Sequence, residues 1–354
     1  MKRYGNLYAR ICAFENLFLA AKKAQKGKRF NERVARFHLD LENELLRLQE
    51  ELLHKTYTPG PYRTFSIYER KPRQISAAPY RDRVVHHALC NIIEPLFDHT
   101  FIHDSYACRT GKGTHKAVAR LTAFSRQKKF VLKCDIKKYF PSIDHERLFE
   151  KIRRKIKCPD TLWLIKTIID HSNPQHEVFD YFQEDNLFEP FERRRGIPIG
   201  NLTSQFFANV YLSDLDHFIK EVLKCRFYIR YVDDLTVLED RKERLWEIKN
   251  AIEAFLERDR LKLHPKKTSL FPVTVGADHL GYRVFPTHRL LRKDTSMRFD
   301  RKLRRMGKFY RDGLISWGEI NSRVQSWLGH AKHADTYGLR KKLFTGIIFR
   351  HQII

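Results

Sequence analysis

The stretch Arg226–Leu235, which reads RFYIRYVDDL, decides the fold class of this chain. An apolar and aromatic run leads into the adjacent Asp233 and Asp234, and a second apolar run, Leu235–Leu238, follows them. Two β-rich runs separated by a short polar segment predict a β-hairpin with the aspartates at its tight turn. An isolated pair of this kind is usually only a turn, because Asp tolerates the left-handed conformation and caps turns. Catalysis becomes the better interpretation only if a further acidic site accompanies the pair.

A third carboxylate, Asp135, occupies a matching context at the end of the β-rich run Phe130–Asp135. Adjacent carboxylates repel each other unless a cation lies between them, and Mg²⁺ prefers carboxylate oxygens as ligands. Two acidic sites on strands that converge on metal are the arrangement of two-metal phosphoryl transfer. The sequence therefore predicts a catalytic metal site at Asp135, Asp233 and Asp234.

The charge of the chain favours a polyanionic partner. Its 354 residues include 68 Lys and Arg against 42 Asp and Glu, which gives a net charge of +26. Release of counterions from phosphates drives nucleic acid onto such basic surfaces. The alternatives are a basic protein that is merely soluble and an anionic membrane surface, but we find no apolar run of about 18 residues that would span a membrane.

Cysteine usage indicates a reducing compartment. The six cysteines form no CxxC pair, so they predict neither a zinc ribbon nor a redox motif. The first residues show no charged-then-apolar signal segment, and we expect reduced thiols and a cytoplasmic location. His86, His87 and Cys90 lie within about one helical turn; a metal site there is the weaker interpretation, and we favour a helix that turns them towards the core or the nucleic acid.

Periodicity and turn residues divide the chain into helices and strands. Apolar spacing of three and four residues predicts helices at 31–53, 82–99, 113–127, directly after 144, at 203–224 and at 242–259. Shorter β-rich runs predict strands at 65–68, 74–77, 130–135 and 279–284. Segment 172–190 is polar, acidic and aromatic without a clear period, and we interpret it as an inserted loop or small flap.

The C-terminal tail is strongly basic. Residues 286–354 carry 16 Lys or Arg against 5 Asp or Glu, a net charge of +11. Within one expected helix, Arg301, Arg304 and Arg305 alternate with Leu303 and Met306. One face of this helix can pack while the other meets phosphate, and a solvated basic face is the alternative.

Further motifs lie between and beyond the aspartates. DIKKYFPSID (135–144) and GIPIGNLTSQ (196–205) precede the hairpin, and PKKT (265–268) and HLGY (279–282) follow it. In this order, with the Tyr-Val-Asp-Asp box, the set resembles the palm motifs of reverse transcriptases over roughly residues 56–285. The resemblance implies an α+β right-hand polymerase with a helical N-terminal extension (1–55), fingers and palm built of antiparallel sheet and helices (56–285, with an insertion at 172–195) and a basic helical thumb (286–354).

A closer resemblance is to the reverse transcriptases of diversity-generating retroelements. It rests on GIPIGNLTSQ and on RDRVVHHALCN (81–91), SYACRTGKGTH (105–115) and SWLGHA (326–331), and it covers almost the whole chain. The insertion at 172–195 is longer than that family predicts. Bacterial reverse transcriptases of antiphage defence systems share much of the pattern, so a defence role is the alternative. The implied activity is RNA-directed DNA synthesis in the bacterial cytoplasm, with an RNA template, a DNA or RNA primer, dNTPs and a small basic helical accessory protein as partners.

The resemblance also assigns ligands and charges to the reaction. Asp135 and Asp233 would bind two Mg²⁺ ions, which Mn²⁺ can replace, with assistance from Asp234 and the Ile136 carbonyl. Positive charge must surround the triphosphate as well. The candidates are Lys71 and Arg73 in the fingers hairpin, which are alternatively solvated charges, and either Lys266 or Lys267, between which the sequence does not choose.

Nucleotide and strand selection fall to a second group of residues. Phe140, five positions after Asp135, would lie under the sugar and exclude a 2′-hydroxyl, unless it is an ordinary core residue. Ile199 and Gly200 are both expected to contact the nucleotide. Ile199 stands where accurate retroviral enzymes carry glutamine, and an aliphatic side chain would check base pairing less strictly. In the resembled family this motif accompanies misincorporation directed by adenine. The implied contacts with nucleic acid are Gln205, a primer grip at Leu280 and Gly281, and Arg301, Arg304 and Arg305.

Two other activities stay open at this point. A non-catalytic, maturase-like RNA-binding protein would explain the charge, but the intact Asp135, Asp233 and Asp234 argue against it. An RNA-dependent RNA polymerase would share the palm, but Phe140 argues against it because the ring would leave no room for a 2′-hydroxyl.

Overall fold

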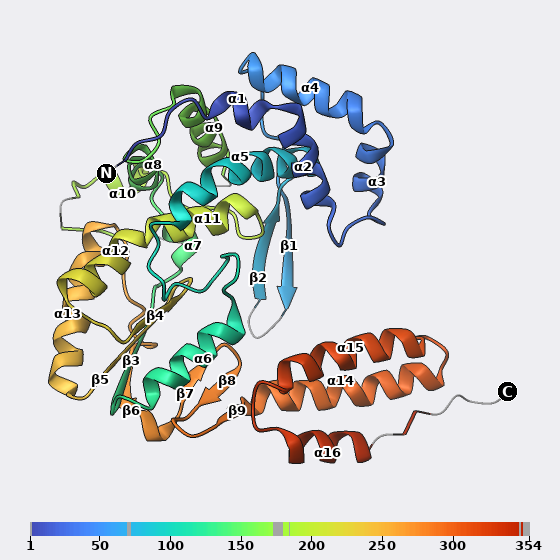
Figure 1. The fold of residues 1–354 in the computed structure, drawn as a ribbon, viewed down its shortest axis with the longest axis vertical. Helices are drawn as coiled ribbons and strands as arrows, with labels where there is room; N and C mark the ends of the chain where they lie inside the picture. The colour runs from blue at the N-terminus through green and yellow to red at the C-terminus, as the bar shows by residue number, and fades with distance from the viewer. Residues whose placement is uncertain (1, 69–71, 173–179, 184, 347, 350–354) are drawn as a thin grey trace.

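The computed structural model describes residues 2–68, 72–172, 180–183, 185–346 and 348–349. In Figure 1 the N-terminal helices form the top of the molecule, the four-stranded sheet lies at the lower left, and the three C-terminal helices form a lobe at the lower right. Helices and antiparallel strands alternate along the chain, so the predicted α+β class is confirmed.

Four helices open the chain: α1 (Tyr8–Cys12), α2 (Phe14–Gln25), α3 (Glu32–Leu39) and α4 (Leu41–Leu53). The prediction of one helix over 31–53 is wrong, because Asp40 interrupts it with φ −122° and ψ 44°. The apolar spacing continues across the break since α3 and α4 both bury their apolar faces in the main core.

A two-stranded hairpin follows, β1 (Arg63–Tyr68) and β2 (Pro72–Ala77), with Phe65 opposite Ile75. Both predicted strands are confirmed, and residues 69–71 between them lie outside the described part of the chain. The hairpin extends from the upper body towards the C-terminal lobe (Figure 1). Its strand β2 leads directly into the long helix α5 (Tyr80–Asp98).

Helices cover the main core around the sheet. The predicted helices are found as α5, α6 (Thr114–Ser125), α8 (His145–Arg153) and α13 (Lys242–Arg258), together with α9 (Pro159–Asp170), which we did not expect, and the short α7 (Tyr139–Ser142) and α10 (Glu189–Glu192). The prediction of one helix over 203–224 is wrong. Leu212 separates α11 (Leu202–Tyr211) from α12 (Ser213–His217), and a π-helical turn, Phe218–Val222, completes the segment.

The central sheet has the strand order β4-β5-β3-β6, all antiparallel. Its strands are β3 (Phe130–Asp135), β4 (Tyr228–Tyr231), β5 (Asp234–Glu239) and β6 (Ser269–Pro272). Successive side chains alternate between the two faces of a strand. Leu132 and Leu235 therefore enter the main core, whereas Val131 and Leu238 enter a second core on the opposite face.

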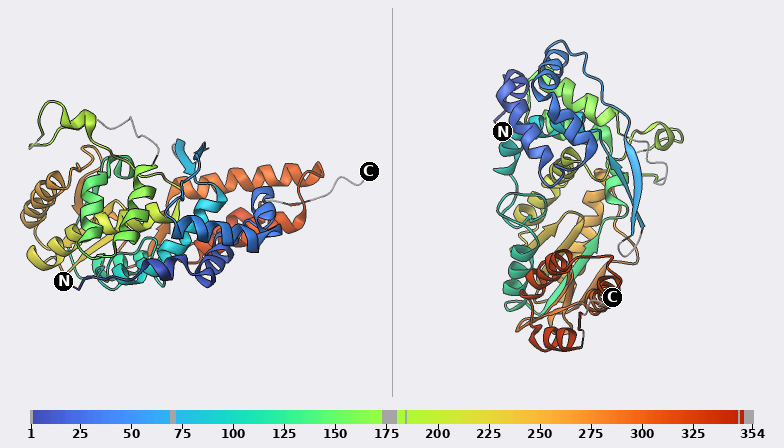
Figure 2. Two further views of the ribbon diagram at one scale, coloured as in Figure 1. Left: turned by 90° about the horizontal axis from the view of Figure 1, so that it is seen from above. Right: turned by 90° about the vertical axis from the view of Figure 1, so that its right-hand side faces the viewer.

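The second core joins α6 to the C-terminal part of the chain. It contains the sheet of β7 (Ala277–His279), β8 (Tyr282–Val284) and β9 (Arg289–Leu291), and the helices α14 (Lys293–Arg311), α15 (Trp317–Ala331) and α16 (Tyr337–Thr345). The predicted strand 279–284 is wrong, because Leu280 and Gly281 form a turn with φ of 49° and 90°. Seen from above, α14 and α15 project lengthwise away from the body (Figure 2). Across the described ranges, no helix combines the length and the apolar character needed to cross a membrane.

Candidate active site

The structure brings the three predicted carboxylates to one end of the central sheet. Strands β4 and β5 pair up to Tyr231 and Asp234, which leaves Val232 and Asp233 as a two-residue turn. Asp234 lies directly opposite Asp135, the last residue of β3. The turn is also tied to the neighbouring strand, since the N–H of Ile136 donates to the carbonyl of Asp233 at 3.3 Å. Both acidic sites thus lie on adjacent, hydrogen-bonded strands.

The electrostatics of this end of the sheet call for a cation. Burial, and then the neighbouring charges of Asp135 and Asp234, raise the pKa of Asp233 to about 6. Burial also raises the pKa of Asp234. The charge of Asp135 adds to this rise, and the charges of Lys133 and Lys267 reduce it. Like charges held close in a poorly solvated place destabilise each other. A bound cation would remove that penalty.

Lys267 supplies part of the missing positive charge. Its ammonium contacts Oδ2 of Asp135, and its side chain is half exposed. Lys266, by contrast, is exposed and donates its backbone N–H to Nδ1 of His264 at 3.2 Å. Of the two lysines left open by the sequence, Lys267 is therefore the one beside the carboxylates.

The donor set fits a divalent metal in its chemistry. Carboxylates and a backbone carbonyl are hard oxygen ligands of the kind that Mg²⁺ prefers, and Asp135 and Asp234 lie opposite each other on paired strands, where their charges repel. Within the described ranges, no group of three or more His, Cys, Asp or Glu side chains is assembled as a metal cluster. The binding of metal by Asp135, Asp233, Asp234 and Ile136 thus remains a prediction.

A cavity of about 370 Å³ opens beside the carboxylates. Asp135, Asp234 and Lys267 line one side, and residues around the 3-10 turn Val273–Val275 and β7–β8, such as Arg283, line the other. The nearby Lys133 donates to the carbonyl of Asp278 at 2.6 Å, which connects β3 to β7 across this cavity. The site is an open, mixed-charge hollow and suits a charged substrate better than an apolar ligand.

The loop before α11 joins the fingers-like hairpin to the residues after Asp135. The carbonyl of Phe140, on α7, accepts from Ile197 at 3.0 Å, and the carbonyl of Ile199 accepts from Ser76 on β2 at 3.0 Å. Phe140 and Ile199 are both half-buried. Gly200 has φ +117°, and a Cβ there would lie 2.7 Å from Cγ2 of Ile75. The Ile75 side chain on β2 therefore lies so close to the loop that a side chain at Gly200 would collide with it.

The other predicted contacts lie on separate elements. Arg73 is exposed on β2, Gln205 is exposed on α11, and Lys71 lies outside the described residues. Leu280 and Gly281 form the β7–β8 turn against α15, where a Cβ at Gly281 would lie 3.3 Å from Nε2 of His330. The α14 arginines, by which we mean Arg301, Arg304 and Arg305, are all exposed on the face of α14 opposite the buried Phe299, Leu303 and Met306.

Two residues that the sequence analysis did not single out also shape the site. Asn201 is buried; its side chain accepts from the N–H of Ala78 at 3.0 Å and donates to the carbonyl of Ser76 at 2.8 Å. Arg230 is completely buried in β4, next to the aspartate turn. An arginine inside an apolar strand run, as in RFYIRYV, is the signal that could have pointed to it, because a buried charge needs a partner.

The histidines of α5 are packed into the protein interior to different extents. His86 and Cys90 are buried and His87 is half-buried. Burial lowers the pKa of His86 to about 3 and that of His87 to about 4, so both are neutral. The favoured interpretation, in which the helix turns some of these side chains towards the core, is confirmed for His86 and Cys90.

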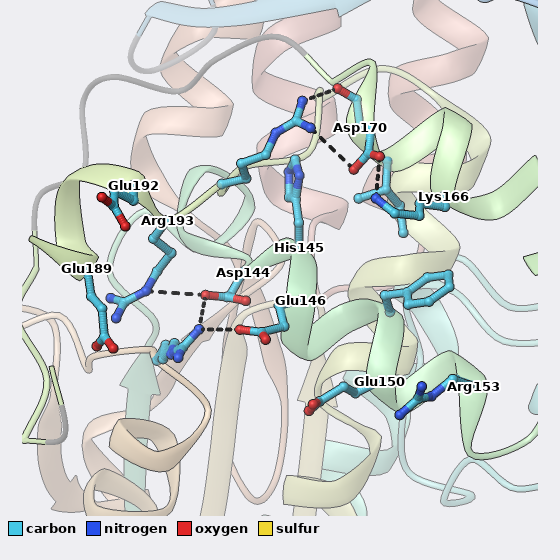
Figure 3. Close-up of a pocket in the computed structure, with 14 residues that line it drawn as sticks. Asp144, His145, Glu146, Glu150, Arg153, Lys166, Asp170, Glu189, Glu192 and Arg193 are labelled. Carbon is cyan, nitrogen blue, oxygen red and sulfur yellow. Dashed lines mark hydrogen bonds and ion pairs between the residues drawn. The ribbon is translucent and has the colours of Figure 1, made fainter. Parts of the chain in front are cut away.

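A larger cavity of about 610 Å³ lies between α8, α9 and α10 (Figure 3). Several of its charged side chains pair with one another: Arg193 and Arg260 contact Asp144 at 3.4 and 2.8 Å, and Arg194 contacts Asp170 at 3.5 Å. Of the described residues that line this cavity, none is a predicted catalytic carboxylate. Arg193 thus connects the 172–195 insertion to the start of α8, and Arg194 connects it to the end of α9. The predicted carboxylates Asp135 and Asp234 line the smaller cavity instead.

Several known proteins are similar to this chain over part or most of its length. The chain is 25% identical over 290 residues to protein YkfC of Escherichia coli (strain K12), covering 71% of this chain and 72% of YkfC. It is also 25% identical over 189 residues to the group II intron-encoded protein LtrA of Lactococcus lactis subsp. cremoris, covering 52% of this chain but only 30% of LtrA. Among solved structures, an apo telomerase from Candida tropicalis, truncated from its C-terminal domain, superimposes with a TM-score of 0.45 at 12% identity over 70% of this chain and 59% of that one.

The family model described as "Reverse transcriptase (RNA-dependent DNA polymerase)" matches residues 63–284. This range begins with β1, ends with β8 and contains the aspartate turn, the loop before α11 and Lys267. The match spans more than half of the chain, and it agrees with the order of motifs and with the α+β fold. The chain belongs to the reverse transcriptase (RNA-dependent DNA polymerase) family, and its activity is RNA-directed DNA polymerisation.

Proposed function

We propose that this chain copies RNA into DNA at the sheet end formed by Asp135, Asp233 and Asp234. The single observation that supports this placement most strongly is the pairing of Asp135 with Asp234 on adjacent strands, with Asp233 in the turn beside them. Divalent metal held by these carboxylates and the Ile136 carbonyl would activate the primer 3′-hydroxyl and neutralise the triphosphate. Mg²⁺ is the expected ion, and Mn²⁺ is the expected substitute.

The chain's own side chains would do the rest. Lys267, already beside Asp135, would hold the phosphate or protonate the leaving pyrophosphate. Arg73 and, from outside the described residues, Lys71 would reach the triphosphate from the β1–β2 hairpin. Arginine suits this role because its planar fork grips two phosphate oxygens at once.

The domain assignment follows the same logic. Residues 1–55 would be a helical extension, 56–285 the fingers and palm, and 286–354 the thumb. The α14 arginines, Gln205 and the turn at Leu280 and Gly281 would then contact the primer–template. The exposed, basic face of α14 opposite its buried apolar face supports this interpretation, since basic side chains bind nucleic acid through its phosphates.

Substrate choice would depend on Phe140 and Ile199. Phe140 lies on the short helix α7, directly after the Asp135 strand, where a ring can limit space at the sugar. Phe140→Ala should therefore raise the use of rNTPs relative to dNTPs, measured as a ratio of kcat/KM values. An unchanged ratio would make Phe140 an ordinary packing residue.

We favour a biological role in a diversity-generating retroelement, with a small basic helical accessory protein as partner. Ile199, aliphatic and half-buried beside Gly200, supports low fidelity because it offers no hydrogen bond to a base pair. A role in antiphage defence is the alternative. A non-catalytic, maturase-like RNA-binding protein is the other alternative, and the intact Asp135, Asp233 and Asp234 argue against it.

The polymerase assignment is tested with Asp233→Asn. We expect Mg²⁺-dependent dNTP incorporation on an RNA template to fall by about 100-fold or more, because the change removes a charge that stabilises the transition state. Asp240→Asn, just past the other end of β5, is the matched control and should keep its activity. Normal extension by a folded Asp233→Asn protein would move the reaction away from this site.

The role is tested by sequencing cDNA made on a defined RNA template. Frequent errors, concentrated opposite adenine, would support the retroelement role, and Ile199→Gln should lower them by about tenfold to a hundredfold. Accurate copying without an adenine bias would favour the defence role.

A further inference from the structure

Arg230 forms a fully buried ion pair behind the aspartate turn. It lies in β4, and neither its side chain nor that of Asp216 on α12 is exposed to solvent. Its Nε donates to both carboxylate oxygens of Asp216, at 2.8 and 2.9 Å, and its Nη2 donates to Oδ2 at 2.7 Å. Tyr228 donates its hydroxyl to the same carboxylate at 2.7 Å. These hydrogen bonds satisfy the two buried charges, which an ion pair shielded from water needs in order to be stable.

The remaining guanidinium nitrogen, Nη1, reaches past this pair towards the catalytic turn. It donates to Oδ1 of Asn209 on α11 at 3.1 Å and to the backbone carbonyl of Val232 at 3.1 Å. Asn209 is itself held in place, because its amide donates to the carbonyl of Ala107 at 2.9 Å. Arg230 therefore connects helices α11 and α12 to the first residue of the turn.

Val232 is a residue that needs such support. It has φ +56° and is the first of the two residues between Tyr231 and Asp234. Glycine is usual at this position of a two-residue hairpin turn with positive φ. A β-branched residue is strained there, and such strain persists only where the surroundings hold the conformation. The next residue is Asp233, so any relaxation of Val232 moves a catalytic carboxylate.

We propose that Arg230 is a positioning residue for DNA synthesis, which holds the Val232 carbonyl so that Asp233 stays beside Asp135 and Asp234. The inference rests on the proposed function, because that function assigns Asp233 to catalysis. Arginine suits this task since its planar fork serves Asp216 with two nitrogens and leaves Nη1 for the turn. A lysine keeps the charge but lacks this geometry.

Stability alone does not account for the arrangement. Replacing a buried ion pair by apolar residues of similar volume is often neutral or stabilising, whereas removal of one partner is strongly destabilising. The double variant Arg230→Met/Asp216→Leu should therefore fold. It lacks the hydrogen bond to Val232, so it isolates the positioning role from the effect of an unpaired charge.

The test compares this double variant and Arg230→Lys with the wild type. In both, we expect kcat for dNTP addition on an RNA template to fall by about 100-fold, because a displacement of about 1 Å in a reacting geometry has an effect of that order. KM for dNTP should change much less, since the residues proposed to hold the nucleotide lie on other elements. The Mg²⁺ concentration for half-maximal activity should rise. Mn²⁺ binding to the free protein, followed by electron paramagnetic resonance, should weaken in parallel.

Lys151→Met is the matched control. Lys151 is also buried and contacts Asp214 and Asp259 at 2.8 and 3.0 Å, away from the turn. This variant should lower the melting temperature yet keep the wild-type kcat and Mn²⁺ binding. If both Arg230 variants unfold at a temperature at which Lys151→Met stays folded, the pair is structural and the proposal is overturned.

Asp233→Asn separates the inference from the function on which it rests. If Asp233→Asn retains synthesis, the proposed site itself is wrong. If Asp233→Asn abolishes synthesis while folded Arg230 variants keep the wild-type kcat and Mn²⁺ binding, the positioning role is refuted and the site stands. A loss of kcat with weaker Mn²⁺ binding in a folded variant supports the positioning role.

Discussion

Gly200→Ala should disturb the polymerase through the β1–β2 hairpin. Gly200 has φ +117°, and an added Cβ would lie 2.7 Å from Cγ2 of Ile75 and 3.7 Å from the carbonyl oxygen of Ser76. Two carbon atoms pack best at about 3.5–4.0 Å, so the hairpin or the loop has to retreat by roughly 1 Å. The hydrogen bond from Ser76 to the Ile199 carbonyl, now 3.0 Å long, lies in the path of that movement.

The size of the effect has two parts. The positive φ makes any non-glycine residue cost about 1–3 kcal/mol in stability, and the overpacking against Ile75 adds about 1–3 kcal/mol. The displacement acts on function as well, since a shift of about 1 Å in a substrate-holding element lowers kcat/KM by up to about 100-fold. We therefore expect both a lower melting temperature and a higher KM for dNTP.

Gly113→Ala is the control that separates these parts. Gly113 has φ +104° and no atom within 4 Å of its added Cβ, so it carries the conformational cost without the collision. It should lose stability and retain kcat/KM. The double variant Gly200→Ala/Ile75→Ala removes the collision, so it should recover kcat/KM while the conformational part of the stability loss remains. If Gly200→Ala affects only stability, as Gly113→Ala does, the close contact with the hairpin does not govern nucleotide binding and the reasoning fails.

Three further predictions concern charge. Replacing the α14 arginines together by Gln should flatten the dependence of log affinity for primer–template on log salt by up to about 1 unit for each phosphate that the protein no longer neutralises, as measured by fluorescence anisotropy; an unchanged slope would identify a solvated face. Lys267→Met should lower kcat by about 100-fold or more because a charged donor leaves the reacting phosphate, while Lys266→Met stays near wild type; equal effects would remove the distinction. Burial lowers the pKa of His86 and of His279 to about 3, below the value of about 6.5 in the unfolded chain. As the pH falls below about 6.5, the unfolded chain therefore binds protons before the folded one does. The free energy of unfolding should drop by about 2 kcal/mol per histidine by pH 5. The free energy of unfolding, measured with urea at a series of pH values, should fall less towards pH 5 in His279→Leu than in the wild type. Identical pH profiles for the two proteins would contradict this linkage.

Local patterns made the centre of the site predictable. Short apolar runs and a polar turn form the hairpin that carries Asp233 and Asp234, and a similar apolar run forms the strand that ends at Asp135. All of these patterns lie in consecutive residues of the sequence. The convergence of the two acidic sites follows from antiparallel pairing of adjacent strands. The sequence patterns therefore located the carboxylates without any knowledge of distant contacts.

Local sequence patterns did not predict where helices break or which of two neighbouring side chains reaches the site. Apolar spacing shows which face of a segment is buried, and that face continues through Asp40 and Leu212 although the helices do not. Lys267 rather than Lys266 meets Asp135 because of the turn in which the N–H of Lys267 donates to the His264 carbonyl at 3.2 Å. That turn is not evident from two adjacent lysines.

Long-range polar partners were the other part that sequence could not supply. Asn201 bonds to Ser76 and Ala78, more than 100 positions away in the chain. Arg230 meets Asp216, 14 positions earlier, only because the fold brings these two side chains together. In each case a polar residue within an apolar stretch indicates that some partner exists, but the partner becomes known only from the fold.

The backbone bonds of the loop before α11 imply that fidelity and nucleotide affinity can be altered separately. Main-chain hydrogen bonds join Phe140 to Ile197 and Ile199 to Ser76, and the side-chain amide of Asn201 bonds to the main chain of Ser76 and Ala78. These bonds keep the loop and the hairpin together whatever side chain stands at 199. Ile199→Gln should accordingly change the error rate with little effect on KM for dNTP, whereas Asn201→Ala, which removes side-chain bonds to Ser76 and Ala78, should raise KM. If Ile199→Gln raised KM as much as Asn201→Ala does, the side chain at 199 would be part of the support and not a reader of the base pair.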